Sequence, residues 1–193
     1  MDMRVYVCEF GKGMDSRSLL GAAFRSYAAA AGIVPAPAPD APGQAGTPAP
    51  APDAPGRDGT PAPDAPGCPE IAFGQYGKPF FAQFPHIKFS VSHSGGLWAC
   101  LMCGFEVGLD IEDTRQRAER AGFDWLGIAR RFFAQDECGY VEGGGRPEEA
   151  LSRFFEIWTK KEAYVKYTGR GIGGGLRGFS VLSGCAGAAF GML

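Results

Sequence analysis

Acidic residues alternate with apolar ones along Val107-Gly-Leu-Asp-Ile-Glu112, a stretch that the sequence predicts to be a β-strand. In a strand, Asp110 and Glu112 would share one face, about 7 Å apart, and the apolar residues would share the other. Two carboxylates that project together repel one another unless a positive charge lies between them. Oxygen ligands in this arrangement suit Mg²⁺, which shares itself with substrate phosphates. The alternative is an exposed acidic strand face that binds nothing.

A second candidate site lies on the helix expected from Pro147 to about Tyr167, ending at Gly169. Phe155, Trp158, Glu162 and Lys166 follow one another at helical spacing and would share one face. A face that packs in the core should have remained apolar along its whole length. A Glu and a Lys on this face therefore indicate a carboxylate, metal and phosphate site, although a surface Glu–Lys pair would have the same spacing.

A third candidate is Phe89-Ser-Val-Ser-His-Ser94, which is followed by two glycines. Ser92, His93 and the backbone N–H groups of such a turn could hold a phosphate. A lone histidine at the end of a strand is more often structural, so this signal is weak by itself. Gly77-Lys-Pro79, upstream, is weaker still as an isolated turn.

The elements that must position these side chains mix strands and helices without a regular β-α-β alternation. Such a mixture favours an α+β fold with antiparallel strand pairing. The expected strands cover residues 4–8, 87–92, 97–103, 107–112 and 179–182, and the expected helices cover 18–31, 123–133 and 147–167.

Proline is concentrated in one segment, since twelve of the 15 prolines lie between Pro35 and Pro69. That segment repeats Ala-Pro-Asp-Ala-Pro-Gly, starting at Ala38, Ala51 and Ala62, and is nearly free of large apolar residues. It cannot bury enough apolar surface to offset the entropy of ordering it. We therefore expect a disordered insert over 35–69, which separates an N-terminal strand and helix (1–34) from the remainder of the fold (70–193).

The composition limits the classes of partner. With 19 basic and 21 acidic residues, the net charge of −2 gives no general attraction to nucleic acid or to anionic lipid. Nothing in the sequence resembles a membrane span or a secretory leader, so a cytoplasmic location is expected. Reduced thiols are then expected for the six cysteines. Cys100 and Cys103 lie three apart on an expected strand and would point to opposite faces, so two buried cysteines are favoured over a metal site.

Five short motifs, taken in order, resemble the 4′-phosphopantetheinyl transferase superfamily, and most closely its surfactin-synthetase-activating type. They cover about residues 77–176 and are Gly77-Lys-Pro79, Phe89-Ser-Val-Ser-His-Ser94, Val107-Gly-Leu-Asp-Ile-Glu112, Phe132-Phe-Ala-Gln-Asp-Glu137 and Trp158-Thr-Lys-Lys-Glu-Ala-Tyr-Val-Lys166. The resemblance implies two similar α+β lobes, of which the N-terminal one is shortened here.

The resemblance also implies an enzyme. It would move the 4′-phosphopantetheine arm of coenzyme A to a serine of an acyl or peptidyl carrier protein and release 3′,5′-ADP. Asp110, Glu112 and Glu162 would hold Mg²⁺, Glu162 would also act as or orient the base, and Lys166 would assist the leaving group. A monomer is favoured over an oligomer.

The remaining residues of the resemblance concern the nucleotide. Side chains that would hold it are Lys78, Pro79, Ser92, His93, Lys161 and Lys166. Arg17 and Arg25 are the candidates for the 3′-phosphate, and Glu137 is a motif acid of open role. Arg115, Arg117 and Arg120 could meet an acidic carrier protein, but a solvated face is the plainer interpretation.

Two other classes remain open. A non-catalytic module, such as an inactive paralogue, would bind coenzyme A or a carrier protein without transfer. An Mg²⁺-dependent phosphohydrolase would share Asp110 and Glu112, but the sequence lacks the dense Asp/His cluster that two-metal hydrolysis uses.

Overall fold

The structure is a computed structural model that describes residues 2–33, 68–171 and 175–182. The chain divides into two compact units, one formed by Met1–Gly13 with Pro69–Leu193 and one by Met14–Cys68. Most of the insert predicted over 35–69 lies outside the described residues, as does Cys185. The domain boundaries expected from the sequence therefore stay predictions.

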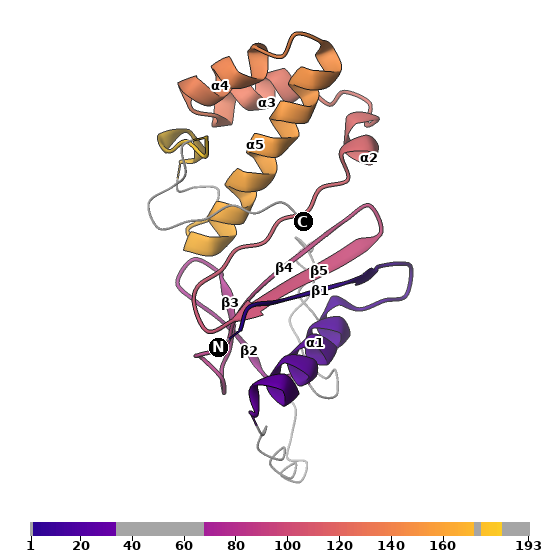
Figure 1. The fold of residues 1–193 in the computed structure, drawn as a ribbon, viewed down its shortest axis with the longest axis vertical. Coiled ribbons are helices and arrows are strands. Elements are labelled where there is room, and N and C mark those ends of the chain that lie inside the picture. The colour runs from indigo at the N-terminus through magenta and orange to yellow at the C-terminus, as the bar shows by residue number, and fades with distance from the viewer. Residues whose placement is uncertain (1, 34–67, 172–174, 183–193) are drawn as a thin grey trace, which may run out of the picture. The chain divides into compact units, whose positions relative to one another are not determined.

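A three-stranded antiparallel sheet forms the centre of the larger unit (Figure 1). Its strands are β1 (Arg4–Glu9), β4 (Lys88–Ser94) and β5 (Leu97–Cys103), in the order β1-β5-β4. Gly95 and Gly96 join β4 to β5 with φ angles of 58° and 79°. A two-residue hairpin with two positive φ angles requires residues such as glycine, so the local sequence fixes this connection.

The sheet confirms the strands expected over 4–8, 87–92 and 97–103. The prediction that the two cysteines of β5 are buried is also confirmed. Cys100 and Cys103 are both buried in β5 as free thiols. A second, smaller sheet pairs β2 (Ile71–Phe73) with β3 (Pro79–Phe81) and was not predicted. Three residues are too few to show a period of two in the sequence.

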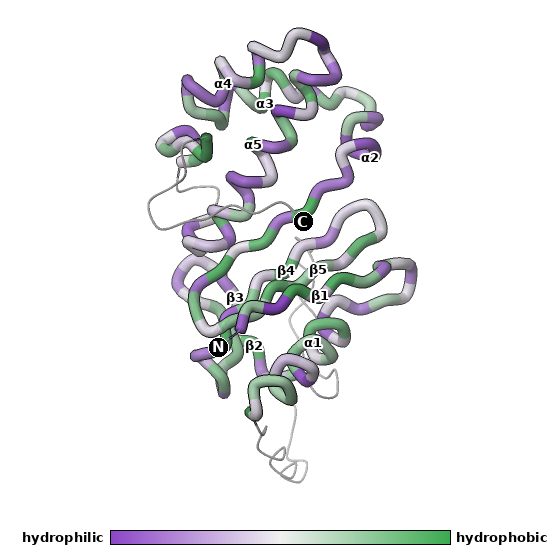
Figure 2. The backbone as a smooth tube through the Cα atoms, viewed as in Figure 1, coloured by the Kyte–Doolittle hydropathy of each residue, from purple (hydrophilic) through white to green (hydrophobic). Residues whose placement is uncertain are grey.

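Among the described residues of this unit, four α-helices follow β5: α2 (Thr114–Ala118), α3 (Trp125–Phe132), α4 (Gln135–Glu142) and α5 (Pro147–Thr168). A short 3-10 helix, η2 (Leu176–Gly178), comes after them. The expected helices over 123–133 and 147–167 are confirmed, whereas α2 and α4 were not predicted. Gly169 ends α5 in the left-handed conformation, with φ 67°. Figure 2 shows hydrophobic and hydrophilic residues alternating along α5, because its sides face different surroundings.

The smaller unit contains α1 (Ser16–Ala31), which confirms the expected helix over 18–31. The Asp15 side chain caps its start by accepting hydrogen bonds from the backbone N–H groups of Arg17 and Ser18. Gly32 ends the helix with φ 67°, as a C-terminal glycine commonly does. None of the described helices is both long and apolar enough to cross a lipid bilayer.

Aromatic rings on α5 form the core of the helical part. Phe154 stacks on Phe133 with 5.3 Å between ring centroids, and Phe155 stacks on Phe123 at 5.9 Å. Val181, at the C-terminal end of the described chain, is buried in the same cluster. The strand expected over 179–182 is wrong, because these residues have no regular structure, and Phe179 and Val181 pack against the helical cluster.

A fully buried ion pair joins α4, α5 and this C-terminal segment. The Lys161 ammonium lies 2.8 Å from Glu137 and donates to the backbone oxygens of Leu176 and Phe179, each at 2.7 Å. The Glu137 carboxylate also accepts from the N–H groups of Ala134, at 2.7 Å, and Val181, at 2.8 Å. Every charge in the pair is compensated, so Glu137, whose role the sequence left open, holds the helical part together.

Replacing Lys161 with Met should lower the free energy of unfolding by about 3–5 kcal/mol, because it leaves the Glu137 carboxylate buried without a counter-charge. Urea unfolding followed by circular dichroism measures this loss. The double variant Lys161→Met/Glu137→Gln should recover part of it, since the uncompensated charge is then removed.

Lys160→Met is the matched control. Lys160 pairs with Glu156 at 2.6 Å on the same helix, but both side chains are partly exposed. An exposed pair of this kind contributes about 0.3–0.5 kcal/mol. Equal losses for the two lysine variants would contradict the structural role of the buried pair.

Candidate functional site

Three serines of β4 hold the backbone of the acidic segment. The N–H groups of Leu109, Ile111 and Asp113 donate to the hydroxyls of Ser90, Ser92 and Ser94, at 2.9, 3.2 and 2.8 Å. Each contact joins residues 19 positions apart, so the segment runs parallel to β4. We call these three contacts the serine ladder.

The serine ladder corrects the strand expected over 107–112. These residues belong to neither sheet, although the contacts at every second residue keep the chain extended. Side chains stand perpendicular to a sheet, so a backbone held by serine hydroxyls lies over the face of β4, parallel to the strand, and does not extend the edge of the sheet. An alternating sequence pattern alone cannot distinguish the two cases.

Two of the serine hydroxyls also bind the carboxylates. Ser92 donates to Asp110 Oδ1 at 2.8 Å, and Ser94 donates to Glu112 Oε1 at 3.1 Å. Each carboxylate is therefore held by the same hydroxyl that accepts the next N–H group of the segment. Asp110 and Glu112 lie on the same side of the chain, as the alternating pattern predicted.

Each of these carboxylates also meets a cation from a helix. The Lys166 ammonium of α5 lies 2.7 Å from Asp110 Oδ1 and 3.0 Å from Ser92 Oγ. Arg117 of α2 lies 2.9 Å from Glu112 Oε2, with its guanidinium over the rings of Phe123 and Trp158. Arg117 was expected on a solvated face, and its place beside Glu112 could not be read from the sequence.

Glu162 is the third carboxylate, half-buried on α5 one turn before Lys166. Among the described residues it makes no hydrogen bond and no ion pair. Burial raises its pKa, and the negative charge of Asp110 raises it further, while Lys166 and Arg117 act in the opposite direction. The charge of Glu112 also contributes to this increase, so Glu162 interacts electrostatically with both carboxylates of the segment.

Gly108 allows α5 to come this close. A Cβ atom at position 108 would overlap backbone atoms of Ala163 and Tyr167. Any other residue would separate the acidic segment from α5 and break the contact between Lys166 and Asp110.

The site does not contain a ready-made coordination sphere. Within the described residues, no three His, Cys, Asp or Glu side chains converge to hold one metal ion. The oxygen donors that Mg²⁺ prefers are supplied by Asp110, Glu112 and Glu162. The ammonium of Lys166 occupies Asp110, and the guanidinium of Arg117 occupies Glu112. The donor chemistry fits a magnesium ion, provided that these cations move aside.

The residues expected to hold a nucleotide do not all meet. Lys78 donates to the backbone oxygens of Val107, at 3.0 Å, and Tyr167, at 2.7 Å, and pairs with Glu106 at 2.7 Å. It therefore joins the turn before Pro79, the first residue of β3, to the acidic segment and the end of α5.

Ser92 and His93 lie on opposite faces of β4, as neighbours in a strand must. Ser92 is buried beside Asp110, whereas His93 is exposed and stacks on Phe10 with 5.3 Å between ring centroids. Lys161 is fully buried with Glu137, a position that supports a structural role. Arg17 and Arg25 lie on α1, in the other unit, and their assignment stays a prediction.

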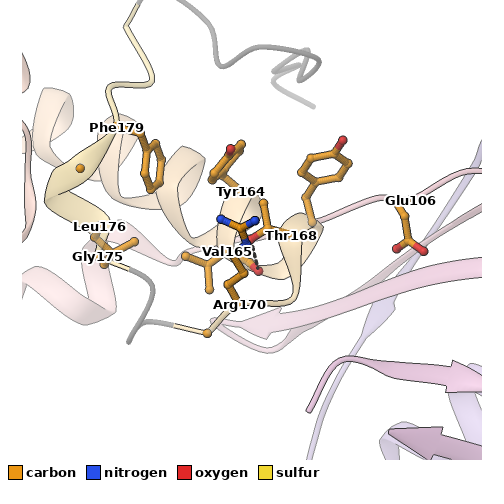
Figure 3. Close-up of a pocket in the computed structure, with 11 residues that line it drawn as sticks. Glu106, Tyr164, Val165, Thr168, Arg170, Gly175, Leu176 and Phe179 are labelled. Atoms are coloured by element: carbon orange, nitrogen blue, oxygen red, sulfur yellow. Dashed lines mark hydrogen bonds between the residues drawn. The ribbon is translucent and has the colours of Figure 1, made fainter. Parts of the chain in front are cut away.

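A cavity of about 500 Å³ lies beside the C-terminal end of α5 (Figure 3). Tyr164, Thr168, Arg170 and Phe179 are among its lining residues, and the rings of Tyr164 and Phe179 lie 4.4 Å apart. Tyr164 and Thr168 follow each other at i+4, two positions out of step with Glu162 and Lys166. The cavity and the carboxylate cluster therefore lie on different sides of the helix.

Comparison with known proteins shows which family the C-terminal part of the chain is similar to. Residues 106–190 match the model of the 4′-phosphopantetheinyl transferase superfamily. The matched span contains Asp110, Glu112, Glu162 and Lys166, and the resemblance drawn from the sequence motifs is confirmed.

Several curated relatives carry the corresponding name. The chain is 40% identical over 102 residues to 4′-phosphopantetheinyl transferase AcpT of Salmonella typhimurium, which covers 52% of this chain and 50% of that protein. It is 33% identical over 107 residues to 4′-phosphopantetheinyl transferase Sfp of Bacillus subtilis, covering 55% and 44%. For psf-1 of Bacillus pumilus the identity is 39% over 105 residues, covering 54% and 41%. The chain thus spans about half the length of the curated relatives it matches.

Glu162→Gln should stabilise the protein at pH 7. The pKa of Glu162 is higher in the folded chain than in the unfolded chain, so its ionised form lowers stability at neutral pH. This cost disappears as the pH falls through the raised pKa of the folded state and below the ordinary glutamate pKa of 4.5, and the advantage of the variant should disappear with it. Thermal unfolding at pH 7 and pH 4 compares the two proteins.

Glu156→Gln is the control of opposite sign. Its hydrogen bond from Lys160 is the main cause of a lowered pKa, so ionised Glu156 stabilises the folded state. This variant should be less stable than the wild type at pH 7, and the loss should vanish in acid. A Glu162→Gln protein that is also destabilised at pH 7 would contradict the electrostatic description of the site.

Proposed function

We propose that the protein transfers the 4′-phosphopantetheine arm of coenzyme A to a serine of an acyl or peptidyl carrier protein and releases 3′,5′-ADP. The observation that carries this proposal is the cluster of three carboxylates and one lysine, all within the superfamily segment. The curated relatives with this transferase name support the reaction.

Asp110, Glu112 and Glu162 would hold Mg²⁺ in this reaction. The ion would neutralise negative charge on the pyrophosphate of coenzyme A and keep it aligned for attack. The charges of Asp110 and Glu112 help to raise the pKa of Glu162, and Lys166 and Arg117 offset this only in part. A divalent cation would relieve the remaining repulsion, which supports the assignment of the three carboxylates.

Glu162 is the proposed base, acting directly or through one water molecule. A carboxylate whose pKa is raised by burial is a better proton acceptor than an exposed one. It would take the proton of the carrier serine as the serine oxygen forms a bond to the β-phosphorus of coenzyme A. The bond from that phosphorus to the oxygen of the leaving 3′,5′-ADP would break in the same step.

Lys166 would compensate the charge that develops on the leaving group. Its ammonium already lies among Asp110, Ser92 and the neighbouring Glu162, so a small side-chain rotation could redirect it to a phosphate. Preorganised positive charge of this kind stabilises a transition state at little cost in reorganisation.

Lys78, Pro79, Ser92 and His93 remain the proposed nucleotide-binding residues. Lys78 could reach a phosphate by exchanging its partner Glu106, which is half exposed. We leave Lys161 out of this set, since its ammonium is fully buried and fully bonded. Coenzyme A and a carrier protein are the proposed partners, and the proposed state is a monomer in the cytoplasm.

Incubation with coenzyme A, Mg²⁺ and an apo carrier protein should add the mass of the phosphopantetheine arm to the carrier, as detected by mass spectrometry. Glu112→Ala and Glu162→Ala should each reduce the rate at least about 100-fold while the circular dichroism spectrum is unchanged. Glu156→Ala, on the same helix as Glu162 but outside the cluster, should keep its activity.

The alternative of a binding module makes a different prediction. Calorimetry would then detect coenzyme A binding, but no carrier protein would gain mass. Such a result across several carrier proteins would replace the transferase with a non-catalytic function.

A further inference from the structure

The serine ladder has a repeating unit of two residues. Ser90, Ser92 and Ser94 alternate along β4, and the three N–H groups that they accept alternate along the facing segment with the same spacing. The unit thus repeats with the pitch of an extended chain, about 7 Å for two residues.

A serine hydroxyl has one hydrogen to donate, and two of the three serines donate it to a carboxylate. Ser92 gives its hydrogen to Asp110 and Ser94 gives its hydrogen to Glu112. The position facing Ser90 in the same repeat is Gly108, which has no side chain. Ser90 therefore anchors the backbone alone, whereas Ser94 anchors the backbone and a carboxylate.

This arrangement fixes both ends of the Glu112 side chain. The ladder holds its backbone through Ile111 N and Asp113 N on either side, and the Ser94 hydroxyl holds Oε1. A glutamate has three side-chain torsions to immobilise before it can act as a ligand, and this immobilisation costs entropy. Ser94 lowers that cost in advance of binding, because the carboxylate is already held.

We propose that Ser94 is a positioning residue, which sets the place of the Glu112 carboxylate for a divalent cation. Ser94 would not touch the cation or the substrate, and acts through Glu112. This inference rests on the proposed function in one respect, namely that Glu112 is a metal ligand.

Ser94 is a better test of the ladder than Ser92. Ser92 also contacts Lys166 and belongs to the proposed nucleotide-binding set, so its replacement would change several interactions together. The Ser94 hydroxyl donates to Glu112 and accepts from the backbone N–H of Asp113. Ser90 is the matched control, because Ser90→Ala removes a backbone anchor of the same kind and leaves both carboxylate contacts in place.

The experiment measures two quantities on the full chain. Amide hydrogen exchange by NMR should become faster at Asp113 in Ser94→Ala and at Leu109 in Ser90→Ala. The affinity for Mn²⁺ alone, measured from its free electron paramagnetic resonance signal, should fall about 10–100-fold in Ser94→Ala, the range expected when a group that orients a ligand is lost. It should change less than about 3-fold in Ser90→Ala.

Two further variants separate positioning from a general loss of structure. Ser94→Thr keeps the hydroxyl and suits a strand, so it should restore the wild-type affinity. In a Glu112→Gln background, Ser94→Ala should cause little additional loss, because the two residues act through one carboxylate.

The outcomes distinguish this proposal from the proposed function. If the wild type binds Mn²⁺ and Ser94→Ala binds it equally well, or if Ser90→Ala loses as much affinity as Ser94→Ala, Ser94 is not a positioning residue and the metal site stands. If the wild type binds no Mn²⁺, the metal assignment and this inference both fail.

Discussion

Repulsion among three neighbouring carboxylates is the constraint on which this site depends. Burial raises the pKa of Glu162, and the negative charges of Asp110 and Glu112 raise it further. The protein compensates the first two with hydroxyl donors and with Lys166 and Arg117, while Glu162 has no such partner among the described residues. A concentrated negative charge of this kind is maintained at a cost in stability, which a site that binds a cation can recover.

The two lysines of α5 show how one helix serves structure and chemistry separately. Lys161 is fully buried, and Glu137 and two backbone oxygens satisfy its ammonium. Lys166, five residues later, points to another side of the helix and reaches Asp110. The first fixes α5 in the helical core, so the second is delivered to the acidic segment in a defined place.

Sequence patterns predicted those parts of the fold that local residues determine. The two-glycine hairpin, the glycine stops of α1 and α5, and the face shared by Glu162 and Lys166 all depend on neighbours in the chain. Arg117 beside Glu112 and Glu137 beneath Lys161 depend on contacts between elements, which no local pattern contains. The acidic segment lies between these cases. Its alternating pattern predicted that Asp110 and Glu112 share a face. The pattern did not predict whether the N–H groups of the segment bond to backbone oxygens of a strand or to serine hydroxyls.

Gly108 links the ladder to the helix. The two-residue repeat that places carboxylates at positions 110 and 112 would place a third side chain at 108, where backbone atoms of Ala163 and Tyr167 leave no room for a Cβ. The missing side chain lets α5 approach the start of the segment. Lys166, a single turn beyond Glu162, then lies within 2.7 Å of Asp110. One position without a side chain therefore brings the residues of a distant helix to the carboxylates of the ladder.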